Sequence, residues 1–257
     1  MGFIKKDNKD YYNPIRRAIL KHGLIEPGDK VAIGMSGGKD STSLLYFLDR
    51  IKKEQRLGFD FDIVPISLDM DMEMDISPMI SFVESLGYNL EVVPTNIATV
   101  VFDIRQERSP CSLCAKLRRG ILNKHAREMG CNKLALGHHL DDAIETYFMN
   151  FLFHGRMASF EPKTYLTNAD ITVIRPLLYL EETMIKKLVK REALPVIFNP
   201  CPVDKKTKRE EIKNLITQVS NQYPDVRKKF VQGMEQGTSA DFWTGSLVTG
   251  DELSKNR

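Results

Sequence analysis

The stretch from Lys30 to Ser41 reads KVAIGMSGGKDS, and it decides the fold class. Its first half, Lys30–Met35, is a short apolar run that ends in small polar residues, which is typical of a buried strand. Helical periodicity begins at Ser41 and continues to Glu54. The stretch therefore predicts a strand, a glycine-containing loop and a helix in direct succession.

The same alternation continues on both sides of this stretch. Further strands are expected at 61–68, 90–93, 133–136 and 171–174. Helices are expected from Asn13 to Gly23 and at 78–87, 114–130, 139–153, 181–192 and 208–222. This order predicts an α/β fold, a doubly wound and mostly parallel sheet of about five strands with helices on both faces.

Ligands of such sheets bind outside the carboxyl ends of the strands. We therefore expect a shared site for Ser36–Ser41, Leu68 and the residues after it, and Gly137–Asp142. The expected organisation is a helical segment at 1–24, a nucleotide-binding domain at 25–200, a helical part at 201–236 and a tail at 237–257 that contains Trp243.

Composition excludes several classes of protein. The chain has 257 residues, 42% of them hydrophobic, and a net charge of only +3, so it is neither mostly disordered nor basic throughout. No apolar run is long enough to cross a membrane, and the first residues lack the apolar core of a secretory signal. We expect a cytoplasmic protein without a membrane partner. Two blocks, 105–130 and 186–213, each carry a surplus of five positive charges and predict an anion-binding face.

The loop after the first strand has the composition of a phosphate site. Gly37 and Gly38 allow a close approach of the backbone to a phosphate, and the following helix directs its N-terminal N–H groups at the anion. Lys39 would add a positive charge and Asp40 a carboxylate for Mg²⁺, while Ser36 and Ser41 supply hydroxyl groups. The spacing of the glycines is that of neither a Walker A loop nor a GxGxxG motif.

A second polar motif, GHHLDD at Gly137–Asp142, follows the strand expected at 133–136. On a helix, His138 and Asp142 would share a face, which allows a zinc site that lacks a third ligand at obvious spacing. We favour a role for Asp142 with Mg²⁺ and phosphate, with Gly137 making room for a nucleotide. Asp141 and Asp142 would also stabilise the start of a helix as N-terminal anions.

Four cysteines in a chain without a secretory signal are better explained as ligands or reactive thiols than as disulfides. Cys111 and Cys114 form a CxxC motif, Cys201 precedes a proline, and Cys131 resembles a small buried core thiol. The first three are compatible with a redox disulfide, a structural zinc site or an iron–sulfur cluster with one open iron. The spacing does not separate zinc from iron–sulfur.

Two resemblances extend this interpretation. SGGKDS resembles the PP-loop of N-type ATP pyrophosphatases, which split ATP between the α and β phosphates. The run CSLCAKLRRGILNKHAREMGCNKLALGHHLDDAIETYFMNFLF, with VIRPLLYLEE and NPCP downstream, resembles the tRNA 2-thiocytidine synthetase family over about residues 14–224. The family's C-terminal motif is not recognisable after residue 225, and the extra zinc-knuckle domains of the 2-thiouridine relatives are not found.

The resemblance implies a cofactor and roles for individual residues. It implies a [4Fe–4S] cluster on Cys111, Cys114 and Cys201, and ATP with Mg²⁺ at the PP-loop. It also implies catalytic roles for Lys39, Arg118 and Asp142. The residues expected to contact RNA are Arg119, Lys124, Lys205 and Lys206.

The expected function is ATP-dependent tRNA thiolation. The enzyme would adenylate a base oxygen, that of an anticodon-loop cytidine, and replace it with sulfur, releasing AMP and pyrophosphate. The sulfur would come from a cysteine desulfurase, a carrier protein or free sulfide, and a homodimer is compatible with the family. Two alternatives stay open: a cluster-free persulfide relay acting on uridine, and a non-catalytic protein that senses nucleotide or iron.

Overall fold

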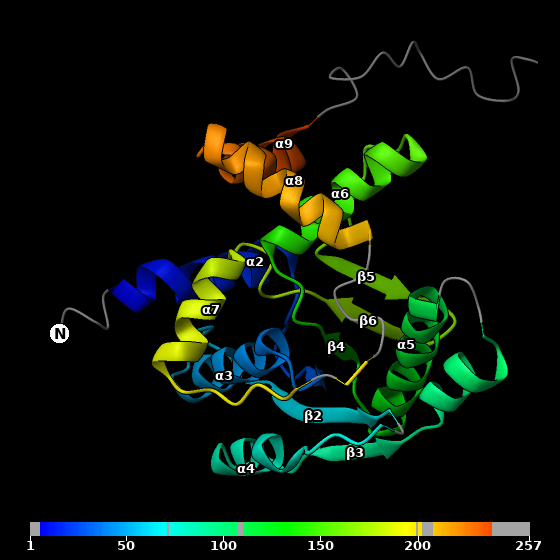
Figure 1. Ribbon diagram of the computed structural model, residues 1–257. Coiled ribbons are helices and arrows are strands. Elements are labelled where there is room, and N and C mark those ends of the chain that lie inside the picture. The colour runs from blue at the N-terminus through cyan, green and yellow to red at the C-terminus, as the bar shows by residue number, and fades with distance from the viewer. Residues whose placement is uncertain (1–5, 71, 107–109, 199, 202–207, 238–257) are drawn as a thin grey trace, which may run out of the picture.

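A computed structural model describes residues 6–70, 72–106, 110–198, 200–201 and 208–237, and its sheet has the strand order β3-β2-β1-β4-β6-β5 (Figure 1). All neighbouring strands are parallel except β5 and β6, which form an antiparallel pair at one edge. The expected doubly wound sheet is therefore confirmed, with one strand more than expected. The strands are β1 (Lys30–Met35), β2 (Asp62–Asp69), β3 (Glu91–Pro94), β4 (Lys133–Ala135), β5 (Lys163–Leu166) and β6 (Ile171–Ile174).

Helices connect the strands and extend beyond them at both ends of the described chain. The first is α2, which follows a π-helical turn, η1, and ends at a left-handed glycine, Gly23, as its sequence predicts. The elements are η1 (Asn8–Tyr12), α2 (Asn13–His22), α3 (Lys39–Lys53), α4 (Ser77–Ser85), η2 (Thr99–Ile104), α5 (Pro110–Glu128), α6 (Leu140–His154), α7 (Glu182–Arg191), α8 (Lys208–Gln222) and α9 (Val226–Gln236).

The two faces of the sheet carry separate apolar cores because side chains alternate along each strand. Val31 and Ile33 face the core formed with α2, α3 and α7, whereas Ala32 and Leu134 pack in the core under α5. All four side chains are fully buried. The strand that leads to the phosphate loop is thus held from both sides, which makes its carboxyl end a rigid support.

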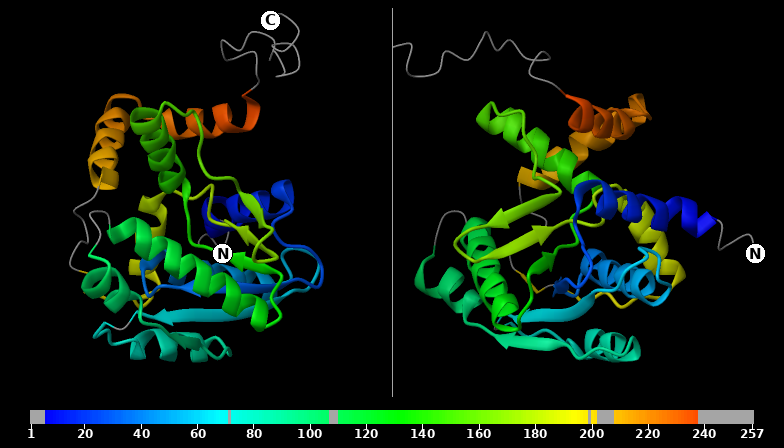
Figure 2. Two further views of the ribbon diagram at one scale, coloured as in Figure 1. Left: turned by 90° about the vertical axis from the view of Figure 1, so that its right-hand side faces the viewer. Right: turned by 180° about the vertical axis from the view of Figure 1, so that it is seen from behind.

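A third apolar cluster joins α6 to the C-terminal helices. Leu140 and Ile144 of α6 pack against Ile212 and Ile216 of α8, and all four are buried. Figures 1 and 2 show α6, α8 and α9 together at one end of the molecule, on the far side from β3 and α4. This packing places the start of α8 beside the start of α6, where the GHHLDD motif lies.

Several elements differ from their predictions, among them the π-helical turns η1 and η2, which were not expected. The edge strand β5 was not expected because its sequence, KTYL, has no apolar run and is only half-buried. Helix α5 begins at Pro110 rather than Cys114, because proline is favoured at the first position of a helix. Both cysteines of the CxxC motif therefore lie in the first turns of a helix.

Among the described helices, none is both long and apolar enough to span a bilayer. The four-segment organisation stays a prediction. The tail with Trp243 and the two lysines Lys205 and Lys206 lie outside the described residues.

Candidate functional site

The structure brings the two glycine-containing motifs together at the point where the strand order reverses. β1 lies between β2 and β4, so the loops after β1 and β4 leave the sheet side by side in the crevice where such folds bind ligands. A Cβ atom on Gly137 would lie 2.8 Å from the carbonyl carbon of Asp40 and 3.0 Å from the amide nitrogen of Ser41. Only glycine allows this approach, so the two motifs lie in direct contact, and the shared site stays a prediction.

The loop between β1 and α3 is shaped to receive an anion. Gly37 has a φ of +74°, a conformation that favours glycine, and Ser41 donates its hydroxyl to the carbonyl of Gly38. The first turn of α3 begins at Lys39, so its N-terminal N–H groups lie next to the loop. Together with the helix dipole, these groups have the polarity that suits a phosphate. Leu68 lies one residue beyond Ser67, the partner of Met35 in the neighbouring strand, and so reaches the same edge of the sheet.

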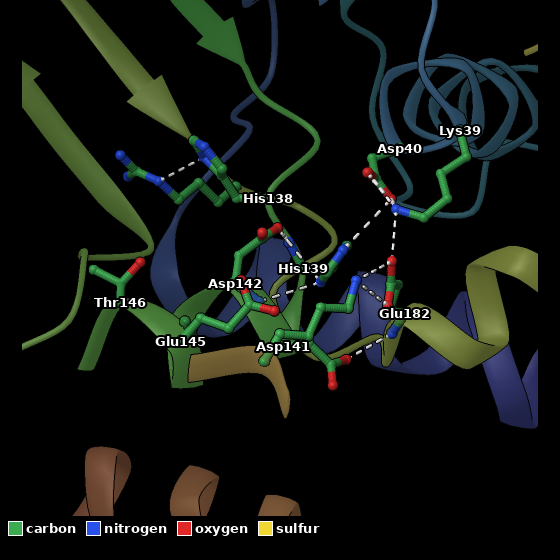
Figure 3. A network of polar contacts seen from close by, with 12 residues as sticks. Lys39, Asp40, His138, His139, Asp141, Asp142, Glu145, Thr146 and Glu182 are labelled. Carbon is green, nitrogen blue, oxygen red and sulfur yellow. Dashed lines mark hydrogen bonds and ion pairs between the residues drawn. The ribbon is translucent and has the colours of Figure 1, made fainter. Parts of the chain in front are cut away.

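Lys39 is held between two carboxylates, as Figure 3 shows. Its ammonium nitrogen lies 2.8 Å from Asp40 Oδ2 and 3.1 Å from Glu182 Oε1. Burial lowers the pKa of Lys39, but the charges and hydrogen bonds of Asp40 and Glu182 outweigh burial and raise it above its usual value. Lys39 therefore stays a cation at physiological pH and lies beside the phosphate loop.

His139 connects the two motifs. As the residue that caps α6, it accepts a hydrogen bond at Nδ1 from the backbone of Asp142, and its own N–H donates to Asp142 Oδ2. Its Nε2 lies 3.5 Å from Asp40 Oδ1. The expectation that His138 shares a helix face with Asp142 is wrong, because the helix begins only at Leu140.

The CxxC pair and the third cysteine also lie near one another. Burial raises the pKa of the Cys114 thiol, Arg118 lowers it, and both Cys201 and Cys111 raise it further. These electrostatic effects place three thiols and one guanidinium in a common neighbourhood. Cys131 is fully buried under α5, as expected for a core residue.

Comparisons with known proteins agree with this geometry. The sequence profile of the PP-loop domain family matches residues 9–220. A tRNA-cytidine(32) 2-sulfurtransferase from Geobacter sulfurreducens is 35% identical over 233 residues, which cover 88% of this chain and 89% of the relative. The chain belongs to the tRNA-cytidine(32) 2-sulfurtransferase family. A member from Haemophilus influenzae is 36% identical and covers 87% of this chain and 73% of its own length.

A solved structure supports the same assignment. The U34-tRNA thiolase from Methanococcus maripaludis, with its [4Fe–4S] cluster, is similar at a TM-score of 0.70 and 25% sequence identity. The match covers 88% of this chain and 78% of the thiolase. A PP-loop domain implies that this member of the family binds ATP.

Glu182 is a residue of the site that the sequence did not reveal. It begins α7 and contacts Lys39 of the PP-loop, Lys186 one turn later and Lys213 of α8. Burial alone would raise the pKa of Glu182, but the hydrogen bonds from Lys213 and Lys186 and the charge of Lys39 lower it to about 2. Its separation from Lys39 along the chain left no local signal, so only the fold could reveal the pair.

The two aspartates of the GHHLDD motif have different roles. Asp141 is buried, accepts a hydrogen bond from the backbone of Glu182 at 2.7 Å and pairs with Arg227 of α9. It therefore joins α6 to α7 and α9. Asp142 lies beside His139 (Figure 3). It pairs with Arg209 at 3.2 Å.

Glu145, one turn after Asp142, was also missed. Burial is the main cause that raises its pKa to about 7; the charge of Asp142 adds to this effect, and Arg209 opposes it. Arg209 lies 3.2 Å from Glu145 Oε2 and thus bridges two carboxylates of α6. This ion pair adds to the apolar packing that holds α8 against α6.

His138 is structural rather than a metal ligand in this geometry. Its ring lies 5.1 Å from that of Phe160, and its Nδ1 accepts a hydrogen bond from Arg175. Burial lowers the pKa of His138 to about 4, so the imidazole is neutral. Within the described ranges, no three His, Cys, Asp or Glu side chains are arranged to hold a metal ion, so the zinc alternative at this motif gains no support.

The predicted RNA contacts are placed in part. Arg119 and Lys124 are exposed on α5, together with the predicted catalytic Arg118, which follows Cys114 by one helical turn. The helix therefore presents cations beside and beyond the cysteines. Lys205 and Lys206 lie outside the described residues.

Proposed function

We propose that this chain is an ATP-dependent tRNA sulfurtransferase that modifies cytidine 32, the base named for its relatives. The base oxygen would attack the α-phosphorus of ATP, pyrophosphate would leave, and sulfur would then displace the oxygen together with AMP. The contact of Gly137 with Asp40 and Ser41, which brings the two motifs of the nucleotide crevice together, is the observation that supports this most. The electrostatic influence of Cys111 and Cys201 on Cys114 adds to it.

Different residues of the crevice would bind the phosphates, stabilise the developing charge and hold Mg²⁺. The N–H groups at the start of α3 and the backbone of Gly37 and Gly38 would hold phosphate oxygens. Lys39, cationic and half-buried between Asp40 and Glu182, would stabilise negative charge that develops as pyrophosphate leaves. Asp40 and Asp142, which flank the same imidazole of His139, would hold Mg²⁺ against the phosphates.

The thiols are the donor set that iron prefers, and we infer that Cys111, Cys114 and Cys201 hold a [4Fe–4S] cluster. Three protein ligands would leave one iron open to carry sulfide to the activated base. Arg118, close enough to Cys114 to lower its pKa, would favour the thiolate form that binds iron. In the described structure the side chains do not form a metal cage, so binding would draw the thiols together.

The remaining partners follow from this chemistry. The substrate would be tRNA in the cytoplasm, and exposed cations of α5 would contact its backbone. A cysteine desulfurase, a carrier protein or free sulfide would supply the sulfur, and a homodimer is compatible with this arrangement.

The test uses the full chain purified without oxygen. Protein, ATP, Mg²⁺, sulfide and unmodified tRNA transcript are combined, AMP and pyrophosphate are measured, and the tRNA nucleosides are analysed by mass spectrometry. We expect AMP release to depend on tRNA and to accompany 2-thiocytidine. AMP release without tRNA, or intact tRNA throughout, would contradict the proposal.

A matched pair of lysine variants on α3 makes the test specific. Lys39→Ala should lower the rate of AMP release about 10²- to 10³-fold, the range for loss of one group that stabilises transition-state charge. Lys53→Ala, at the other end of the same helix, removes an ion pair with Asp49 and should leave the rate near that of the unaltered enzyme. Equal losses in both variants would point to damage of the helix instead.

A further inference from the structure

A pocket of about 690 Å³ lies between the C-terminal half of α5 and the β5–β6 hairpin. The turn of this hairpin, residues 167–170, is at the end of the sheet where β6 begins, whereas the PP-loop is at the opposite end, where β1 ends. Figure 1 shows the tip of β5 beside α5. The lining residues are Gly120, Asn123, Lys124, Arg127, Glu128, Tyr165, Leu166, Thr167, Asn168 and Ala169.

One wall of the pocket is an aromatic ring held in a fixed position. The hydroxyl of Tyr165 donates to Asp170 Oδ1 at 2.7 Å, although the residue is 57% exposed. The other oxygen of Asp170 accepts from Arg127 Nη2 at 2.6 Å, and Arg127 also donates to the carbonyl of Cys131. One carboxylate thus orients a ring and a guanidinium on neighbouring elements. A ring that is oriented but exposed is suited to stacking on a planar ligand.

The α5 side of the pocket contains an amide with unused hydrogen-bonding capacity. Asn123 is 6% exposed, and its Oδ1 is buried with no partner among the described residues. Such orphaned groups are rare because an unmade buried hydrogen bond costs about 1–3 kcal/mol. Rotation of the amide exchanges its oxygen and nitrogen, so the residue could offer an acceptor or two donors to a ligand.

The pocket is also kept open at Gly120. This glycine lies inside a helix, where it is less favourable than alanine by about 1 kcal/mol. A Cβ atom at Gly120 would meet nothing within 4 Å, so the fold itself has no need for the small residue. The space that it leaves is part of the pocket.

A row of exposed cations on α5 extends from the CxxC motif to this pocket. Lys116, Gly120, Lys124 and Arg127 follow one another at helical spacing on α5, and the three cations among them are exposed. Lys124 is 79% exposed and has a distant ion pair of 3.8 Å with Glu128. Asn123 is nine residues after Cys114, which is about 14 Å along a helix. A single-stranded nucleic acid spans this distance with a few nucleotides.

We propose that this pocket receives an unstacked nucleotide of the RNA substrate, a few nucleotides away from the base that reacts. Tyr165 stacks on the base, Asn123 bonds to the edge of the base, and Lys124 contacts the phosphate. This inference rests on the proposed function, since it requires that the substrate is RNA. It gives the enzyme a second point of contact, which fixes how the reactive loop lies along α5.

Affinity for fluorescently labelled unmodified tRNA, measured by anisotropy at constant salt, tests the pocket. Tyr165→Ala should weaken binding about 5- to 150-fold, as expected for the loss of one base–aromatic stack. Tyr165→Phe keeps the ring and should bind within about 3-fold of the unaltered protein, since only the bond to Asp170 is lost. Tyr223→Ala, which removes a tyrosine of similar exposure, 59%, on the turn between α8 and α9, should have no effect.

Gly120→Leu separates occupancy of the pocket from folding. Leucine favours the helix and fills the pocket, so the melting temperature should hold or rise while the affinity for tRNA falls about 10-fold or more. AMP affinity, a property of the PP-loop, should be unchanged in all four variants.

Three outcomes bear on the proposal separately. Unaltered protein that binds no tRNA would contradict the proposed function. Binding by the unaltered protein with unchanged affinity in both Tyr165→Ala and Gly120→Leu would overturn the pocket alone. CMP is titrated in parallel, and CMP binding that depends on Tyr165 while tRNA binding does not would make this a mononucleotide site and overturn the RNA assignment.

Discussion

The nucleotide crevice and the cysteine site are built in opposite ways. In the crevice, Lys39, Glu182 and Lys213 form a continuous chain of ion pairs across three helices. At the cysteines, Cys111 is exposed, and Cys114 and Cys201 are only half-buried. The protein alone organises the first site, whereas the three thiols would take up one geometry only on binding the proposed cluster.

This contrast has a physical reason. Opposite charges and hydrogen bonds hold each other in place without any ligand, and burial strengthens them. Thiols are weak hydrogen-bonding groups, so they have little attraction for one another until a metal ion bonds to them. Changes in the crevice should therefore affect ATP chemistry while leaving metal content intact, and changes at the thiols should do the reverse.

The largest effect is expected at the thiols. Cys201→Ala should abolish thiolation and sharply lower the iron content of protein purified without oxygen, because it removes one of the three proposed ligands. ATP binding should persist. Iron and acid-labile sulfide are assayed together with the absorption band near 400 nm.

Cys131→Ala is the matched control. This thiol is fully buried in the core under α5, so its loss should destabilise the fold by about 1 kcal/mol and leave the iron content unchanged. Iron loss in Cys131→Ala but not in Cys201→Ala would reverse the assignment of the ligands.

A smaller effect is expected at Glu182. Glu182→Gln removes the carboxylate that holds Lys39 and Lys213, so AMP release should fall about 10- to 100-fold through misplacement of Lys39, with iron content unchanged. Glu181→Gln, the adjacent position, serves as control, since the described contact of the Glu181 side chain is a hydrogen bond from Thr183 and not an ion pair with Lys39. Equal activity of the two variants would show that Lys39 needs no positioning.

Glu182 also predicts a dependence of stability on pH. Its folded pKa of about 2 lies below the ordinary value of 4.5, so the stabilisation that it provides is complete above pH 4.5 and is lost as the pH falls toward 2. Chemical denaturation of the unaltered protein and of Glu182→Gln should therefore converge over this range. If the free energies of unfolding of the two proteins differ by a constant amount over this pH range, Glu182 is not the titrating group.

The smallest effect is expected at Glu145. Its contribution to stability changes with pH in the opposite direction to that of Glu182. Burial raises its folded pKa to about 7, so the folded state holds a proton that the unfolded state releases above pH 4.5, and stability falls as the pH rises from 4.5 to 7. Glu145→Gln should be nearly neutral at pH 5 and stabilising by about 2 kcal/mol at pH 8. Chemical denaturation of both proteins at pH 5 and at pH 8 measures this difference in stability. If Glu145→Gln is less stable than the unaltered protein at pH 8, the ion pair with Arg209 outweighs the cost of burial.

Local patterns were sufficient for much of the fold. β1 was predicted with its observed bounds because an apolar run between turn residues has few alternatives, and α2 ends at Gly23 because its left-handed conformation suits glycine. β5 was missed because an edge strand buries little and needs no apolar run. The start of α5 was placed four residues late because the apolar periodicity begins after the CxxC motif, although Pro110 was a visible signal.

The sequence by itself determined the motifs: the phosphate loop at Ser36–Ser41, the GHHLDD motif and the CxxC pair are contiguous patterns. Only the tertiary structure decided the partners of these residues. Glu182 holds Lys39, Arg209 covers Asp142 and Glu145, and Tyr165 faces Asn123 across a pocket, each from an element distant along the chain. Motifs are local because one turn or one helix end can present several groups to a ligand. Charge partners are not local, because any oppositely charged side chain that the packing brings within reach can serve, and packing is decided by the whole core.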